Sequence, residues 1–287
     1  MSSNNYEIYK GYIESPLRSV KYDTYFPAYE KVLSSFKEKK SITLVEIGVH
    51  NGGSLYMWQN YFGKKANIIG IDLNPNAKKF EKDGFKIFIG DQADKNFWDN
   101  FFSEVGKVDI VIDDGGHTYE QQIITLNSCL SFINDGGVLI TEDVHTSYFK
   151  SFGYPSKLTF VNWTKKIIDN INSRSENVRT VDNIYSQVLS SIEFFESLVV
   201  FNVDRQLAVK SKSVSNDGET QNLTDFRYQS NLLNKLVNKL DKYEKKIYTY
   251  NKKNLINKIL LRLISLTREN TLRLYNLSKV RRYKKYF

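Results

Sequence analysis

The chain has 287 residues, of which 41% are hydrophobic and 14% aromatic, which suffices for at least one sizeable core and for about two domains. This composition excludes a disordered protein. A single cysteine and three scattered histidines exclude a disulfide-stapled secreted scaffold and a zinc finger, so we expect a cytoplasmic protein. The sequence predicts neither a signal peptide nor a membrane-spanning segment.

The positive charge is concentrated at one end of the chain. Residues 231–287 hold 16 basic and 3 acidic residues, a net charge of +13, whereas residues 1–230 hold 25 basic and 29 acidic residues, a net charge of −4. The body is therefore mildly acidic, and the overall charge of +9 belongs to a basic tail.

Residues 1–40 have a mostly helical pattern and are expected to form an N-terminal cap. From there to residue 205, β-branched apolar runs alternate with amphipathic segments, a rhythm that predicts a parallel sheet with crossover helices. The runs are ITLVEIG at 42–48, IIGIDL at 68–73, FKIFIG at 85–90, VDIVIDD at 108–114 and GVLITED at 137–143. Residues 191–203 then predict an antiparallel hairpin that completes the sheet.

The last part of the chain divides into a polar linker at 206–230 and a helical tail at 231–287. Apolar residues in the tail recur at helical spacing, with lysines and arginines between them. This pattern resembles an amphipathic helix lying on anionic lipid, which would make the protein a peripheral membrane protein. An oligomerisation or packing helix is the rival interpretation, and nucleic acid is the least favoured partner.

Acidic residues stand at the end of every predicted parallel strand. Because buried carboxylates are costly unless they are paired or bind cations, their repetition at the edge where open α/β sheets bind ligands predicts a site. The residues are Glu46, Asp72, Asp91, Asp113, Asp114, Glu142 and Asp143.

The segment VEIGVHNGGS predicts a glycine turn that opens the first helix after the sheet begins. Gly48 and Gly52 allow backbone amides to approach a ligand, with Ser54 at the helix start. The segment lacks the GxGxxG dinucleotide pattern, and Glu46 just before it disfavours a phosphate and suits a cationic ligand group.

Two further strand ends fit the rest of a nucleoside. Asp72 lies where an acid accepts hydrogen bonds from a ribose diol, and Asp91 with Gln92 lies where a base edge would be. A ribose acid and a base-edge pair without a phosphate motif predict an adenosine compound that carries an amino acid, S-adenosylmethionine.

In order and spacing, the motifs VEIGVHNGGSLYMW, GIDLNP, GDQAD, IDDGGH and ITEDVHTSYF resemble the class I S-adenosylmethionine-dependent methyltransferases. Within that family, the chain is most similar to the metal-dependent sugar O-methyltransferases of the mycinamicin and macrocin type and to related polysaccharide-modifying enzymes. The resemblance covers residues 20–205. It implies a Rossmann-like α/β fold with a mostly parallel seven-stranded sheet and an antiparallel terminal hairpin.

A metal site is expected where the fourth and fifth strands end. We assign Asp113 to the cofactor side and Asp114 to the substrate side, because neighbouring strand residues face opposite ways. Asp114, Glu142 and Asp143 would converge and repel one another without a cation, and oxygen ligands favour Mg²⁺, with Mn²⁺ or Ca²⁺ as alternatives. The resemblance implies the same three ligands.

His117, three residues after Asp114, is the expected catalytic base that takes the proton of the acceptor hydroxyl. The resemblance places the catalytic histidine at the same position, with His145 as the competing candidate. The residues expected to shape the acceptor pocket are Tyr22, His145, Thr146 and Tyr148.

The sequence thus predicts an S-adenosylmethionine- and divalent-metal-dependent O-methyltransferase, expected as a homo-oligomer. Its acceptor would be a sugar hydroxyl on a nucleotide-sugar or glycan in bacterial capsule, lipopolysaccharide or other glycan biosynthesis. A metal-dependent phenol or catechol O-methyltransferase is one alternative. A catalytically inactive binding module associated with membrane or RNA is the other.

Overall fold

The computed structural model describes residues 5–153, 156–176, 178–179, 181–219, 231–251 and 254–286. The chain forms two compact units, Met1–Val214 and Ser215–Phe287, which are described separately. Residues 220–230 of the predicted linker lie outside the described residues.

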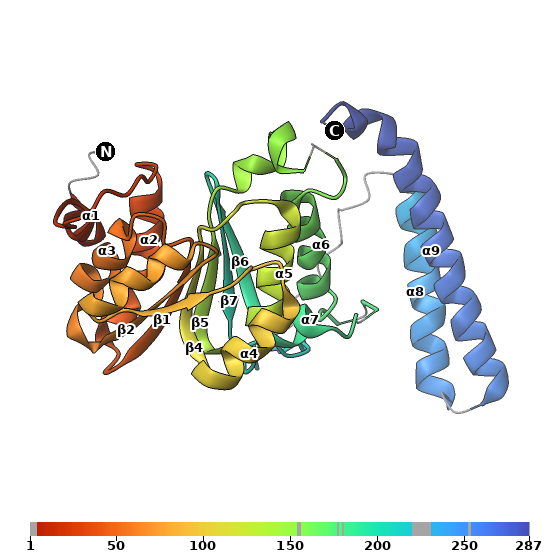
Figure 1. The fold of residues 1–287 in the computed structure, drawn as a ribbon. Coiled ribbons are helices and arrows are strands. Elements are labelled where there is room, and N and C mark those ends of the chain that lie inside the picture. Colours follow the sequence, from red (N-terminus) through yellow and green to blue (C-terminus); the bar gives the residue numbers. More distant parts are fainter. Residues whose placement is uncertain are drawn as a thin grey trace. The chain divides into compact units, whose positions relative to one another are not determined.

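The first unit is built on a seven-stranded sheet with the order β3, β2, β1, β4, β5, β7, β6 (Figure 1). The parallel strands are β1 (Ile42–Ile47), β2 (Ala66–Asp72), β3 (Lys86–Ile89), β4 (Val108–Asp113) and β5 (Ile133–Thr141). The strands β6 (Leu189–Phe195) and β7 (Leu198–Val203) form an antiparallel hairpin, and β7 pairs with β5. The predicted Rossmann-like fold with a terminal hairpin is confirmed.

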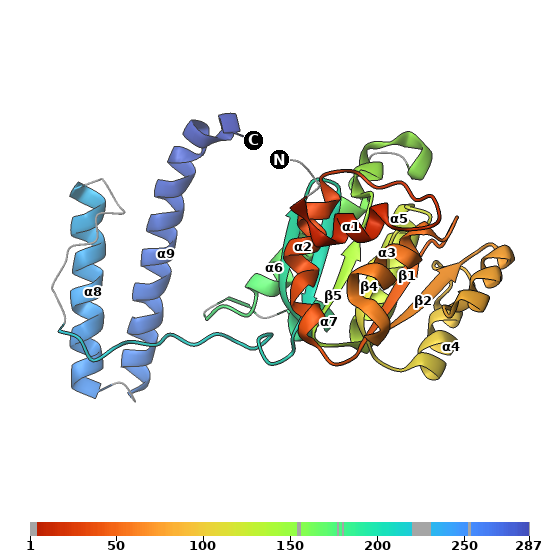
Figure 2. The ribbon, with the colours of Figure 1, turned by 90° about the vertical axis from the view of Figure 1, so that its left-hand side faces the viewer.

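Helices cover both faces of this sheet (Figures 1 and 2). One face carries α1 (Glu7–Ile13), α2 (Tyr25–Leu33) and α3 (Gly53–Phe62), and the other carries α4 (Lys95–Val105), α5 (Tyr119–Cys129), α6 (Phe160–Asn172) and α7 (Ile184–Val188). Neighbouring strand residues divide between the two cores: Leu44 belongs to the first, and Val45 to the second. Strands buried on both faces explain why the apolar runs in the sequence are continuous.

The strand β5 begins earlier than the apolar run at 137–143 predicted. It starts at Ile133 and includes Gly136, whose φ is +75°. Its pairing with β4 shifts register between Val108 and Ile110, so the polar residues before the run join the strand irregularly.

The parallel arrangement brings the carboxyl ends of β1, β2, β3, β4 and β5 to one edge of the sheet. The chain between α1 and α2 has no regular structure over residues 18–22. These residues form what we call the strap, and the strap and α2 supply side chains to the same edge.

The second unit holds α8 (Asn231–Asn251) and α9 (Leu255–Tyr283). The two helices lie side by side as an antiparallel hairpin (Figures 1 and 2). Asn254 caps α9 by accepting a hydrogen bond from the Ile256 amide.

Candidate active site

The turn between β1 and α3 requires glycine at two positions. Gly48 and Gly52 have φ angles of +92° and +82°. A Cβ atom at Gly48 would lie 2.0 Å from the Asp114 carbonyl oxygen, and one at Gly52 would lie 2.4 Å from the Phe80 ring. The positive φ angles and the close packing thus explain why glycine occupies these two positions.

A pocket of about 870 Å³ opens at the carboxyl edge of the sheet. Its walls combine the glycine turn, the strap and the loops after β2, β3 and β4. Of the residues predicted to contact the cofactor, Gly48, Ser54, Asp72, Asp91 and Gln92 line it. A pocket of this size accommodates a nucleoside-sized ligand.

The Asp72 carboxylate is fixed at the mouth of this pocket by two backbone amides. Oδ2 accepts a hydrogen bond from the His50 amide at 2.8 Å, and Oδ1 accepts one from the Asn74 amide at 2.8 Å. Each oxygen has a second lone pair, so the carboxylate can still accept hydrogen bonds from a ligand.

Two other acids predicted to contact the cofactor do not line the pocket. Glu46 is fully buried under α3, where it accepts hydrogen bonds from Ser54 Oγ at 2.8 Å and from Trp58 Nε1 at 3.0 Å. Burial raises the pKa of Glu46 to about 7, although Lys21 opposes this rise. Glu46 therefore anchors the helix that begins at the glycine turn.

Asp113 is buried at the end of β4. It accepts a hydrogen bond from Gln92 Nε2 at 2.8 Å, and Gln92 Oε1 accepts one from the Gly116 amide at 2.9 Å. Burial raises the pKa of Asp113 to about 6. Asp113 thus holds the side chain of Gln92, which lines the pocket. The side-chain amide of Gln92 in turn holds the loop after β4 through Gly116.

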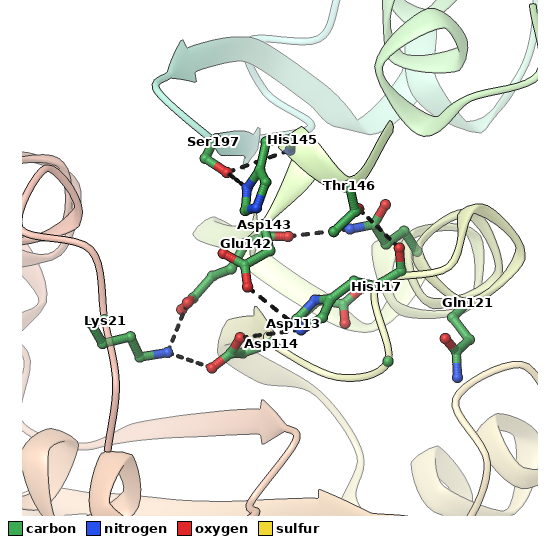
Figure 3. Close-up of polar contacts among 12 residues, drawn as sticks. Lys21, Asp113, Asp114, His117, Gln121, Glu142, Asp143, His145, Thr146 and Ser197 are labelled. Carbon is green, nitrogen blue, oxygen red and sulfur yellow. Dashed lines mark hydrogen bonds and ion pairs between the residues drawn. The ribbon is translucent and has the colours of Figure 1, made fainter. Parts of the chain in front are cut away.

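A buried lysine pairs with two of the three acids beside the pocket, Asp114, Glu142 and Asp143, which we call the acid cluster (Figure 3). Lys21 Nζ lies 2.6 Å from Asp114 Oδ2 and 2.7 Å from Glu142 Oε2, and the lysine side chain is 1% exposed. Burial alone would lower the pKa of Lys21, but the two carboxylates raise it well above its ordinary value. Burial and the neighbouring Asp114 raise the pKa of Glu142 to about 8.

Helix α2 supplies two tyrosines to the same acids. Tyr25 donates a hydrogen bond to Asp143 Oδ1 at 2.5 Å, and Tyr29 donates one to Glu142 Oε1. Tyr25 and Tyr29 are four residues apart in α2, a spacing that places both on one face of the helix, whereas Lys21 lies in the strap before it. Sequence reasoning overlooked Lys21 and Tyr29, because the strap and α2 both lie far from the acids along the chain.

His117 joins this cluster on the side away from Lys21 (Figure 3). Its Nε2 lies 3.6 Å from Asp143 Oδ2 and 3.9 Å from Asp114 Oδ1. Ligand atoms of Asp114, His117 and Asp143 all lie within 4.8 Å of one another. Glu142 was also predicted as a metal ligand, but its two carboxylate oxygens accept hydrogen bonds from Lys21 and Tyr29 instead.

Backbone strain concentrates around the cluster. Among the described residues, positive φ angles outside glycine occur at His50, His117, Asp143 and Ser197. Such angles persist only where surrounding contacts impose them, and they recur at functional sites. Two of these residues, His117 and Asp143, belong to the cluster itself.

A second pocket of about 470 Å³ contains three of the four residues predicted for the acceptor, namely Tyr22, His145 and Tyr148. Tyr22 packs edge-on against His145, with ring centroids 5.6 Å apart, and His145 Nδ1 contacts Ser197 Oγ. Tyr22 also packs against Tyr25, the hydrogen-bond partner of Asp143. Side-chain contacts through Tyr22 and Tyr25 therefore link the second pocket to Asp143 of the acid cluster.

Thr146, the fourth predicted acceptor residue, does not line this pocket. It is buried, and its Oγ1 donates a hydrogen bond to the His117 carbonyl oxygen at 3.1 Å. Its position indicates a role in holding the His117 loop.

The site lies in a part of the chain that is similar to known proteins. Residues 45–144 match the family model described as a methyltransferase domain. The chain is 31% identical over 159 residues to 8-demethyl-8-alpha-L-rhamnosyl tetracenomycin-C 2'-O-methyltransferase of Streptomyces olivaceus, covering 52% of this chain and 41% of that protein. It is 30% identical over 134 residues to mycinamicin VI 2''-O-methyltransferase of Micromonospora griseorubida, covering 44% of this chain and 33% of that protein.

The fold is shared with a solved structure of MycE methyltransferase in complex with Mg and SAH. The TM-score is 0.61 at 22% identity, over 79% of this chain and 58% of that one. The match covers less than half the length of each of the two curated relatives named above. Residues 45–144 thus hold a methyltransferase domain, and the chain is similar over 52% and 44% of its length to the two O-methyltransferases named above.

Proposed function

We propose that the protein transfers a methyl group from S-adenosylmethionine to a sugar hydroxyl with the help of a divalent cation. The observation that carries this proposal is the opening of the large pocket directly beside the cluster of Asp114, His117 and Asp143. A cofactor in the pocket would present its methyl group to a hydroxyl held at the cluster. The relatives named above, a 2'-O-methyltransferase of a rhamnosyl tetracenomycin-C and a 2''-O-methyltransferase of mycinamicin VI, support the acceptor class.

The pocket walls suit each part of the cofactor. The fixed Asp72 carboxylate can accept hydrogen bonds from the ribose diol, and Asp91 with Gln92 lies one strand further along the sheet for the base. The methionine portion would lie against the glycine turn, where Gly48 and Ser54 line the pocket. No basic phosphate cradle is needed for this ligand.

The donor set of the cluster fits a hard cation. Two carboxylates within reach of one another are the ligands that Mg²⁺ prefers, so Asp114 and Asp143 are the ligands that this geometry supports. Glu142, the third ligand expected from the sequence, joins them only if it releases Lys21. When bound, the cation supplies a Lewis acid that makes the acceptor hydroxyl a better proton donor.

His117 is the base in this proposal. The hydroxyl proton passes to its Nε2, and the carboxylates of Asp114 and Asp143 stabilise the positive charge that the ring acquires. The freed oxygen bonds to the methyl carbon while the carbon–sulfur bond breaks, and its electron pair goes to sulfur. The products are the methylated sugar and S-adenosylhomocysteine.

The second pocket is the proposed place for the remainder of the acceptor. Tyr22 and Tyr148 are 54% and 66% exposed and offer aromatic faces to a sugar ring. We propose a nucleotide-sugar or glycan of bacterial capsule, lipopolysaccharide or related glycan biosynthesis as the acceptor.

Calorimetric titration tests the cofactor part of this proposal. S-Adenosylmethionine and S-adenosylhomocysteine are titrated into wild type, Asp72→Ala and Asp99→Ala, each with and without Mg²⁺. Asp99 is a matched control because it is an acid on the surface of α4 whose partner is Lys95. We expect binding by wild type and Asp99→Ala and loss of binding in Asp72→Ala. A folded wild-type protein that binds neither compound would contradict the proposal.

A further inference from the structure

The tail hairpin leaves a large apolar surface without a partner in its own unit. Along α9, eight leucine and isoleucine side chains at helical spacing are between 42% and 71% exposed. They are Leu255, Ile256, Ile259, Leu260, Leu263, Leu266, Leu274 and Leu277, and we call them the α9 stripe.

The α9 stripe is distinct from the face of α9 that holds the hairpin together. On that other face, Leu261, Ile264 and Leu272 are only half-exposed, and Arg268 forms ion pairs with Asp241 at 2.9 Å and with Glu244. A helix with one apolar face satisfied and a second one exposed needs a further surface to cover the second.

Charge indicates which surface that is. Lys258, Arg262 and Arg273 fall along one border of the α9 stripe at 100° per residue, and residues 231–287 carry +13 overall. A second copy of the tail would bring two units of this positive charge together, and the two copies would repel one another. An anionic surface would be attracted, and basic residues beside an exposed apolar stripe are the pattern of helices that lie in a lipid interface.

The hairpin cannot reach this surface by spanning the bilayer. Among the described residues, no helix combines the length and hydropathy that a transmembrane segment requires. We propose that the α9 stripe lies in the interface of an anionic lipid bilayer, with Lys258, Arg262 and Arg273 at the headgroups. The apolar side chains enter the acyl boundary, and the stripe residues are covered by lipid.

Vesicle flotation with the full chain tests this inference. The probes are vesicles of phosphatidylcholine alone and of phosphatidylcholine mixed with phosphatidylglycerol. We expect binding to the mixed vesicles only, weakening as salt rises from about 0.1 M to about 1 M, because the screening length falls from about 10 Å to about 3 Å. No binding to mixed vesicles at low salt would overturn the inference.

Two pairs of variants separate the stripe from general charge and general hydrophobicity. Arg262→Gln with Arg273→Gln should weaken binding about 30-fold, at about fivefold to sixfold per charge near the surface. The matched control, Lys82→Gln with Lys107→Gln, removes the same charge from exposed positions in the first unit and should change binding little.

The second pair removes apolar side chains. Ile259→Ser with Leu263→Ser should weaken binding at least about tenfold. The control is Leu207→Ser with Val209→Ser, because those side chains are 67% and 60% exposed and lie outside the hairpin. Circular dichroism shows whether the hairpin keeps its helices, and the charge variants test the inference even if the serine variants unfold. Equal effects of the variants and their controls on vesicle binding would overturn the inference. It would also be overturned if wild type bound no vesicles and formed a dimer in light scattering that Ile259→Ser with Leu263→Ser dissociates.

Discussion

The buried carboxyl of Glu46 should make the protein less stable as the pH rises. Its ordinary pKa of 4.5 is raised to about 7 in the folded chain, chiefly by burial. A carboxyl with a raised pKa contributes stability that is fully present below its unfolded pKa and is lost as the pH rises through its folded pKa. The pH window of this loss is therefore about 4.5 to 7.

The size of this effect follows from the shift. At about 1.4 kcal/mol per pKa unit, the shift corresponds to about 3 kcal/mol of unfolding free energy. Glu46→Gln keeps a neutral group of the same shape, and its amide can retain the contacts with Ser54 and Trp58. The variant should match wild type at pH 4.5 and exceed it by up to about 3 kcal/mol at pH 8.

Urea unfolding of both proteins at a series of pH values measures this difference. Asp99→Asn is the control, because it also neutralises an acid but at an exposed position. A difference between Glu46→Gln and wild type that is the same at pH 4.5 and pH 8 would refute the reasoning. A variant less stable than wild type at pH 8 would refute it as well.

Three further substitutions test the surroundings of the site. Lys21→Met should lower the unfolding free energy in EDTA by about 3 kcal/mol, because the buried Glu142 and the partly exposed Asp114 lose their cation, and Mg²⁺ should restore part of it in urea titrations. Gly52→Ala should lower the melting temperature more than Gly63→Ala, because both have positive φ but only Gly52 faces a ring at 2.4 Å; equal shifts would contradict this. Thr146→Val should cost about 1 kcal/mol in urea and slow methyl transfer, since the His117 carbonyl loses a donor; an unchanged rate would argue against a role in holding the loop.

The centre of the sheet was predictable from sequence because strands such as β1 and β4 are buried on both faces over most of their length. Continuous β-branched runs follow from that burial, as in the run that contains Leu44 and Val45. Acids at the strand ends marked the functional edge for the same reason, since a carboxylate there interrupts an apolar run. The early start of β5 escaped prediction because the polar Asn134 and Asp135 follow Ile133 and the pairing there is irregular.

The finer structure of the site depended on contacts that are distant in sequence. Asp72 and Gln92 were expected in the cofactor pocket and line it, but Glu46 was placed there by position alone. Nothing local in the sequence shows that Trp58 and Ser54 of the next helix bury it. Lys21 reaches its partners across 93 and 121 residues, a separation that no periodicity encodes.

The most direct test of the proposed chemistry is to follow a labelled methyl group from S-adenosylmethionine to a sugar. Wild type and His117→Ala are incubated with the cofactor, Mg²⁺ and a panel of nucleotide-sugars and glycans, and the product is located by NMR. We predict a new methyl ether on a sugar oxygen with wild type and a loss of at least about 100-fold with His117→Ala. Methylation of a catechol but of no sugar, or equal rates for the two proteins, would contradict the account.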